Sequence, residues 1–177
     1  IGSNFVRYAL DAHPDWEITN LDKLTYAGNP ANLVDLRDHP RHRFVKGDIC
    51  DPEAVENCVR GTEVVINFAA ESHIDRSIAN PSDFIMTDMY GAYVLLEAAR
   101  RFDVERFVQI STVEVYGEAG PVPPDEEGPL RPKSPYAASK AGGDRLCYSY
   151  FVTYHTPVVI VRCVNNYGPY QYPEKVI

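Results

Sequence analysis

Short apolar runs alternate with amphipathic stretches along the chain. The runs are rich in Val, Ile and Phe and end in polar or small residues, which is typical of strands buried on both faces of a parallel sheet. Strands are expected at 16–24, 43–49, 63–70, 106–110 and 157–163. Helices are expected at the start of the chain, at 52–60, at 81–102 and at 136–150. This alternation predicts an α/β fold with a doubly wound, mostly parallel sheet.

The beginning of the helix expected at 136–150 carries the first candidate chemistry. Ser134 is a good helix N-cap and Pro135 a good first helical residue, which sets Tyr136 and Lys140 one turn apart on the same face. An ammonium group beside a phenol favours the phenolate, and a phenolate formed near neutral pH can take a proton from a sugar or alcohol hydroxyl. The same Tyr-x-x-x-Lys spacing also arises by chance on surface helices.

A second spacing points to a nucleotide cofactor. Asp22 ends an expected strand and lies 20 residues after Gly2, about the spacing at which a dinucleotide-binding fold places an acid against the adenosine ribose. A helix N-terminus at Gly2 would present unpaired N–H groups to a pyrophosphate. A carboxylate at Asp22 would repel a 2′-phosphate, which favours NAD over NADP. Taken alone, Gly2 is more often a turn or packing residue and Asp22 an ordinary loop acid.

Composition narrows the possible partners. The 177 residues, 45 % of them apolar, suffice for one sizeable core, and 17 basic against 25 acidic residues give a net charge of −8 that disfavours nucleic-acid binding. The four cysteines show no C-x-x-C pairing, which disfavours a zinc site and suits a reducing cytoplasm. No apolar run is long enough to span a membrane and no signal segment opens the chain. A cytoplasmic protein is therefore expected; one whose signal was trimmed would read the same.

Thr112, Tyr136 and Lys140 together resemble the Ser/Thr-Tyr-Lys set of the short-chain dehydrogenase/reductase superfamily. Three further stretches make the resemblance specific to its extended branch, the NAD-dependent epimerases and dehydratases, and most of all to the dTDP-glucose 4,6-dehydratases. These stretches are LTYAGN at 24–29, AAESHIDRSI at 69–78 and NNYGPYQ at 165–171. The resemblance runs from residue 1 to residue 177.

The resemblance implies a Rossmann-type, NAD-binding domain with a defined set of contact residues. It assigns cofactor contacts to Ile1, Gly2, Asp22, Lys23, Leu24, Thr25, Asp48, Ile49, Phe68, Ala69, Ala70, Thr87, Tyr136, Lys140 and Asn166. It assigns substrate contacts to Ser72, Thr112 and Asn165. Asp48 also reads as a helix cap, but Asp51 is the better cap candidate, which leaves Asp48 freer for the ligand.

The reaction implied by the resemblance starts from a nucleotide-activated glucose, in the first place dTDP-glucose. Tyr136, assisted by Lys140 and Thr112, would remove the proton of the sugar 4-hydroxyl while hydride passes from C4 to NAD. Glu114 would then take the C5 proton, water would leave across C5 and C6, and hydride return would give a 4-keto-6-deoxy sugar. The plain alternative for Glu114 is a surface acid after a strand.

Two positions depart from these relatives. Val113 stands where they carry an Asp that donates the proton to the leaving C6 hydroxyl, so the elimination step is expected to be impaired because valine has no proton to give. Asp88 stands where they usually carry Asn.

The resemblance also sets expectations for the boundaries and the assembly. In a Rossmann fold the first strand lies between the second and the fourth, and here no strand pattern precedes the first helix. We therefore expect one incomplete NAD-binding domain over 1–177, a gap in its sheet, and an internal piece of a longer protein that lacks most of the sugar-nucleotide lobe. The acidic, Pro-rich loop at 117–133 is expected to be ordered at the site, with disorder as the alternative. A homodimer is expected through the helices at 81–102 and 136–150.

Two other functional classes stay open on the sequence alone. A sugar-nucleotide 4-epimerase or a uronate decarboxylase of the extended branch would use the same Tyr and Lys. A non-catalytic, NAD-binding relative that serves as a scaffold is the other.

Overall fold

The computed structural model describes residues 1–118 and 120–174. These residues form two compact units, one made of Ile1–Asp48 with the residues from Asn165 onward and the other of Ile49–Val164. Every strand pair in both units is parallel, which confirms the α/β class with parallel sheets. None of the helices in the described part of the chain is long and apolar enough to cross a membrane.

The first unit is a small α/β layer. It contains α1 (Gly2–Ala12), β1 (Ile18–Asp22), the 3-10 helix η1 (Pro30–Leu36) and β2 (His42–Lys46). Strands β1 and β2 pair in register from Ile18 opposite His42 to Asp22 opposite Lys46. The core of this unit consists of apolar side chains from α1, β1 and η1, namely Val6, Leu10, Ile18, Leu33 and Leu36.

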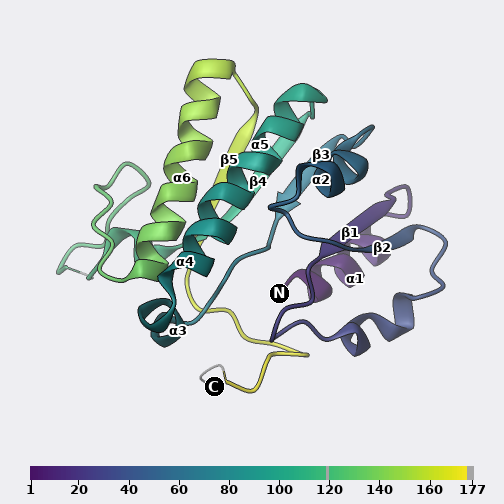
Figure 1. Ribbon diagram of the computed structural model, residues 1–177, viewed down its shortest axis with the longest axis horizontal. Coiled ribbons are helices and arrows are strands. Elements are labelled where there is room, and N and C mark those ends of the chain that lie inside the picture. The colour runs from purple at the N-terminus through teal and green to yellow at the C-terminus, as the bar shows by residue number, and fades with distance from the viewer. Residues whose placement is uncertain (119, 175–177) are drawn as a thin grey trace. The chain divides into compact units, whose positions relative to one another are not determined.

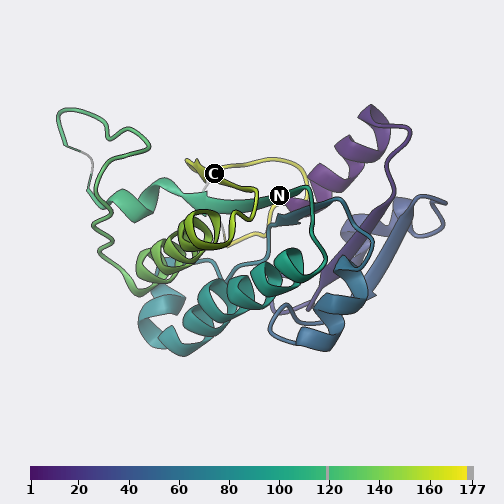
Figure 2. The ribbon, with the colours of Figure 1, turned by 90° about the horizontal axis from the view of Figure 1, so that it is seen from above.

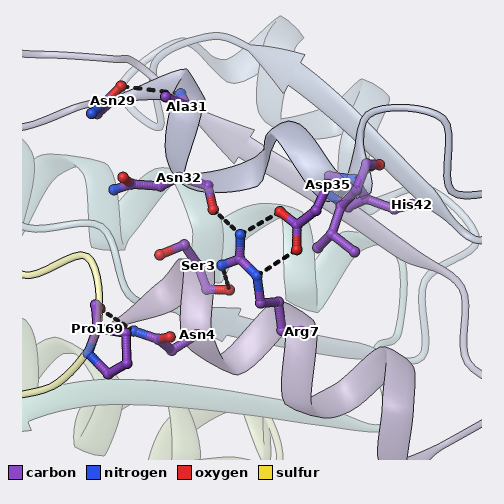
Figure 3. A network of polar contacts seen from close by, with 10 residues as sticks. Ser3, Asn4, Arg7, Asn29, Ala31, Asn32, Asp35, His42 and Pro169 are labelled. Atoms are coloured by element: carbon purple, nitrogen blue, oxygen red, sulfur yellow. Dashed lines mark hydrogen bonds and ion pairs between the residues drawn. The ribbon is translucent and has the colours of Figure 1, made fainter.

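Arg7 ties the polar side of this unit together (Figure 3). Its Nε donates to Asp35 Oδ2 at 2.8 Å and its Nη2 lies 2.5 Å from Asp35 Oδ1, while further hydrogen bonds reach the carbonyls of Ser3 and Asn32. This two-pronged hydrogen bond lowers the pKa of the Asp35 carboxyl. The helix α1 is thereby fixed to η1 by polar contacts as well as by its apolar face.

The second unit is built around a sheet of order β3-β4-β5. Its strands are β3 (Val64–Asn67), β4 (Arg106–Thr112) and β5 (Val158–Cys163). Its helical segments are α2 (Pro52–Val59), α3 (Ile74–Ala79), α4 (Pro81–Phe84), the π-helical η2 (Ile85–Gly91), α5 (Ala92–Arg101), the 3-10 helix η3 (Val113–Tyr116) and α6 (Pro135–Tyr154). The helices α5 and α6 lie side by side on one face of β4 and β5 (Figures 1 and 2).

Burial along β4 alternates as expected for a strand with one helix-covered face. Phe107, Gln109 and Ser111 are buried, and their register partners on β5 include Val158 and Ile160. Because Gln109 is buried at a strand position, its amide needs a partner, and Asn67 Nδ2 of β3 donates to its Oε1 at 3.0 Å. The carboxyl ends of these strands lead directly into the candidate site.

The described strands form two separate sheets, β1-β2 and β3-β4-β5. The interruption expected between the strands at 16–24 and 63–70 is therefore present. The observed strands are shorter than the expected ones except for β4, which extends two residues further, and the segments α3, η1 and η3 were not expected at all.

The prediction of one continuous helix at 81–102 is wrong in one respect. This stretch consists of α4, η2 and α5 in succession, and the middle segment has π-helical rather than α-helical hydrogen bonding. Gly91, the last residue of this segment, packs closely against Ile49: an added Cβ would fall 2.5 Å from Ile49 Cδ1. The spacing of apolar residues does not distinguish a π-helical segment from an α-helical one.

Candidate active site

Thr112, Tyr136 and Lys140 lie at the carboxyl end of β4 and in the first turns of α6. Thr112 is the last residue of β4 and is buried. Ser134 caps α6 as expected, since its Oγ accepts from the Ala137 N–H at 3.1 Å. The cap and Pro135 fix where the helix begins, so Tyr136 and Lys140 fall one turn apart.

Tyr136 sits in a half-buried position beside Phe84, whose ring meets it edge-on with 6.2 Å between centroids. Burial raises the pKa of Tyr136, and the charges of Asp88 and other acidic neighbours add to the rise. A hydrogen bond with Thr112 acts in the opposite direction. Burial and the neighbouring negative charges thus oppose the phenolate, and the Thr112 hydrogen bond favours it.

Lys140 is buried and its ammonium has a fixed protein partner. Its Nζ donates to the carbonyl oxygen of Ile110 on β4 at 2.8 Å. This hydrogen bond connects α6 to the carboxyl-terminal part of β4. It holds a positive charge at the carboxyl edge of the sheet, next to the residues that follow β4.

Asp88 was noted in the sequence only as a departure from relatives, yet the structure places it beside this group. Its side chain is 2 % exposed, and its oxygens accept from Ser139 Oγ at 2.7 Å and from the Glu71 N–H at 3.2 Å. Burial raises the pKa of Asp88 to about 6, against the lowering effect of the Lys140 charge. A carboxylate inside an otherwise apolar helix pattern was the signal that sequence reasoning could have used.

Glu114 and Val113 follow Thr112 in the short helix η3. Thr112 Oγ1 accepts from the Glu114 N–H at 3.2 Å, so Thr112 caps η3 as well as ending β4. The Glu114 side chain is exposed and Val113 is half-buried. The position between Thr112 and Glu114 therefore offers no proton.

The loop after η3 is held by Arg162 of β5. Its Nη1 donates to Tyr116 Oη at 2.6 Å and to the Glu126 carbonyl at 2.9 Å, while its Nε pairs with the fully buried Asp144 at 2.9 Å. These contacts tie residue 126 of the loop expected at 117–133 to β5 and α6; Ala119 lies outside the described residues.

The second unit also carries the predicted contacts around the end of β3. Phe68, Ala69 and Ala70 follow that strand, and Asn67 Oδ1 accepts from the Ala69 N–H at 3.1 Å, which shapes the backbone there. Ser72 is half-buried in the segment before α3, and Thr87 is half-buried in η2. Ile49 is buried against Gly91 and therefore serves as a core residue in this unit.

The first unit holds the remaining predicted contacts. Lys23 and Thr25 flank the turn after β1, and Leu24 between them has a positive φ of 55° and donates its N–H to Asp22 Oδ1 at 2.7 Å. Lys23 Nζ pairs with Asp48 Oδ2 at 2.7 Å, so two predicted cofactor contacts pair with each other.

The other members of this set lie at the ends of segments. Ile1 and Gly2 stand at the beginning of α1, and Asn165 and Asn166 are exposed after β5. Asp51 caps α2 as expected, because its Oδ1 accepts from the Glu53 N–H at 3.0 Å.

Comparisons with known proteins identify relatives over the full chain. The family model described as GDP-mannose 4,6 dehydratase matches residues 1–177. A low-salt glycan biosynthesis protein, Agl12, from Haloferax volcanii is 52 % identical over 100 % of this chain and 57 % of its own length. A dTDP-glucose 4,6-dehydratase from Streptomyces niveus is 50 % identical over 100 % of this chain and 54 % of its own length.

A solved structure is similarly close. The dTDP-glucose 4,6-dehydratase DesIV from Streptomyces venezuelae, crystallised with NAD bound, superposes with a TM-score of 0.95 at 50 % identity, over 99 % of this chain and 56 % of that one. The resemblance to dTDP-glucose 4,6-dehydratases is thereby confirmed. The chain spans about half the length of the curated relatives it matches.

Proposed function

The chain belongs to the GDP-mannose 4,6 dehydratase family, and we propose from this that the protein converts a nucleotide-activated glucose, dTDP-glucose first, to its 4-keto-6-deoxy form. The observation that carries the proposal is the group at the end of β4. There Thr112 is hydrogen-bonded to Tyr136, and Lys140 is anchored one turn further along α6. Relatives that are 50 % identical are dTDP-glucose 4,6-dehydratases.

The proposed cofactor is NAD, and the residues of the chain suit it. Asp22 presents an exposed carboxylate at the carboxyl end of β1, where a ribose would find an acceptor. Small side chains at Ala69 and Ala70 leave the backbone after β3 accessible. NAD would supply the acceptor for a hydride from the sugar C4 and return it at C6. We also propose that the two compact units are parts of one NAD-binding domain.

In the proposed mechanism Tyr136 acts as the base for the sugar 4-hydroxyl. Thr112 donates or accepts at the same phenol and would orient the hydroxyl of the substrate, while Lys140 holds positive charge nearby. Oxidation at C4 would acidify the C5 proton, and the exposed carboxylate of Glu114 would accept it. Ser72 and Asn165 would contact the sugar nucleotide.

Product analysis tests this proposal directly. The full-length protein is incubated with NAD and dTDP-glucose, and the product is identified by mass spectrometry. Loss of one water supports the dehydratase. An unchanged mass with inverted C4 would identify an epimerase. In a parallel incubation with a nucleotide-activated uronic acid, loss of carbon dioxide would identify a decarboxylase. No turnover of either substrate would identify a non-catalytic relative.

Val113 is the reason to expect a slow elimination. General acid catalysis typically contributes about 10²–10⁴-fold, and the valine between Thr112 and Glu114 cannot supply it. We propose that C4 oxidation proceeds while water loss lags. Replacing Val113→Asp should raise the rate of water loss at least about tenfold; an unchanged rate would show that the protein never needed this acid.

We further propose a cytoplasmic homodimer. None of the four cysteines, all of which lie in the described residues, forms a disulfide, which suits a reducing compartment. Apolar and aromatic side chains remain exposed on η2, α5 and α6, namely Tyr90, Tyr93, Tyr148, Phe151, Val152 and Tyr154. Two copies of this surface, related by a two-fold axis, would cover each other.

A further inference from the structure

Asp88 is a buried carboxylate in η2, the π-helical segment packed against α6. Burying an ionised carboxylate without an equivalent charge partner costs several kcal/mol, about the scale of the whole stability of a domain. π-helical segments are frequent at functional sites. Its position beside Tyr136 and Lys140 therefore makes Asp88 a candidate for a functional role.

The hydroxyl of Ser139 links Asp88 to the catalytic turn of α6. Ser139 Oγ lies 2.7 Å from Asp88 Oδ2 and 2.8 Å from the backbone carbonyl oxygen of Tyr136. One hydroxyl hydrogen cannot serve both acceptors. When Asp88 is ionised, Ser139 donates to the carboxylate; when Asp88 is protonated, its own O–H can donate to Ser139, which then donates to Tyr136 O.

The charged and titratable groups that face Asp88 come from two elements. They are Lys140 and Tyr136 of α6 and Glu71 of the segment after β3. On the β4 side, the neutral amide of Gln109 lies against Gly143, which the backbone of Asp88 also approaches. Other titratable groups near η2 have partners of their own. Cys50 donates to the Met86 carbonyl of η2, Asp83 accepts from Asn80, Glu97 bonds to Arg100 and Tyr150, Arg101 bonds to Glu56, and Asp144 of α6 pairs with Arg162.

We propose that Asp88 is a positioning residue that holds the Tyr136–Lys140 turn through Ser139 and, by its negative charge, shifts to higher pH the range in which Tyr136 can accept a proton. This proposal rests on the proposed role of Tyr136 as base. Burial places the pKa of Asp88 at about 6, so its charge appears close to neutral pH. Once ionised, Asp88 raises the pKa of Tyr136 and so delays the formation of the phenolate to higher pH.

The first test compares the full-length protein with its Asp88→Asn variant. Asn has the shape of Asp, can accept from the Glu71 N–H and can donate to Ser139, but it carries no charge at any pH. C4 oxidation of dTDP-glucose is followed in a single turnover, by absorbance of the reduced cofactor, from about pH 5 to pH 9. The acidic limb of the rate profile should move to lower pH by at least about half a unit in Asp88→Asn.

Asp144→Asn is the matched control. Asp144 is also fully buried and lies on α6, the helix that carries Tyr136 and Lys140, but its carboxylate pairs with Arg162. The acidic limb of the pH–rate profile of Asp144→Asn should lie at the same pH as in the parent, even if the rate itself is lower. An unmoved limb in Asp88→Asn, or an equal shift in both variants, would overturn the proposal.

A second readout does not need the reaction. The pKa of Asp88 is raised from 3.8 to about 6 in the folded protein, so a proton bound there stabilises the fold at low pH and this contribution is lost as the pH rises through about 6. The melting temperature of Asp88→Asn minus that of the parent should therefore increase between about pH 4 and pH 7. A constant difference would contradict the proposal; a parent that forms no reduced cofactor would instead refute the proposed function and leave this comparison valid.

Discussion

Tyr136 is subject to opposing effects whose sum decides whether it can act. Burial and the negative charges around it raise its pKa, and the Thr112 hydrogen bond lowers it. The ammonium of Lys140 is held by the Ile110 carbonyl at the end of the same strand that carries Thr112. A substrate hydroxyl would therefore meet a phenol whose pKa depends on its burial, on the neighbouring negative charges and on Thr112.

Removing the phenol tests this residue most simply. Tyr136→Phe keeps the ring contact with Phe84 but removes the proton acceptor, a loss typically worth about 10²–10⁴ in rate. C4 oxidation in a single turnover should fall by that factor. Tyr116→Phe is a fair control, because Tyr116 Oη accepts from Arg162 and its loss should cost stability more than rate. An undiminished rate in Tyr136→Phe would end its assignment as base.

Asp22 should decide between the two nicotinamide cofactors. Its exposed carboxylate would repel the 2′-phosphate of NADP, so the full-length protein should bind NAD clearly more tightly than NADP, and Asp22→Ala should narrow the ratio. Asp22→Ala also removes the acceptor of the Leu24 N–H and so loosens this turn. That effect acts on both cofactors alike and cancels in the ratio of the NAD and NADP affinities. Asp51→Ala, which removes a helix cap, should leave the ratio unchanged. Equal affinities in the parent would exclude Asp22 from this role.

The site residues that could be predicted are those defined by local spacing. Tyr136 and Lys140 follow from a helix cap and a one-turn interval, and Asp51 follows from cap chemistry. The environment of Asp88 could not be predicted, because Ser139 and Glu71 reach it from distant parts of the chain. The ion pair of Lys23 with Asp48 likewise depends on how β1 and β2 pair.

At the scale of elements, α6 shows how one helix can satisfy two constraints. Its interior contains Gly142 and Gly143, which the sequence marks as costly unless another backbone packs closely. The structure supplies that backbone: a Cβ on Gly143 would fall 2.7 Å from the carbonyl oxygen of Asp88. The close approach of η2 to α6, and with it the contact between Asp88 and Ser139, requires glycine at that position.

Alanine substitutions at the two glycines should therefore differ. At Gly142 an added Cβ would meet only the flexible end of Met89, so the gain in helix propensity, about 1 kcal/mol, should offset most of the crowding. At Gly143 the neighbour is backbone, and overpacking typically costs about 1–3 kcal/mol. Thermal melting should show Gly143→Ala clearly less stable than Gly142→Ala. Equal melting temperatures would mean that η2 can withdraw from α6 at little cost.

At the scale of the whole molecule, hydrophobic alternation was enough to predict parallel strands, and the strand order of a Rossmann fold predicted the interruption between β1 and β3. Hydrophobic alternation could not predict the π-helical segment, since the spacing of apolar residues does not distinguish π-helical from α-helical hydrogen bonding. Nor does the alternation show which exposed surfaces have partners. One such surface lies on α5 and α6. Glu97 bonds to Tyr150 and Arg100 lies over the ring of Tyr154, so the two helices form one continuous outer surface.

The proposed dimer predicts how that surface behaves. Phe151 is 53 % exposed on α6 and Tyr93 is 42 % exposed on α5, and aromatic side chains left in water at this density are typical of interfaces. The full-length protein should sediment as a dimer at micromolar concentration, and Phe151→Glu should shift it to monomer because a charge would be buried twice in a symmetric contact. Val122→Glu, at an apolar side chain 81 % exposed in the loop after η3, should stay dimeric. A parent that sediments as a monomer would show that these aromatic side chains remain in contact with water.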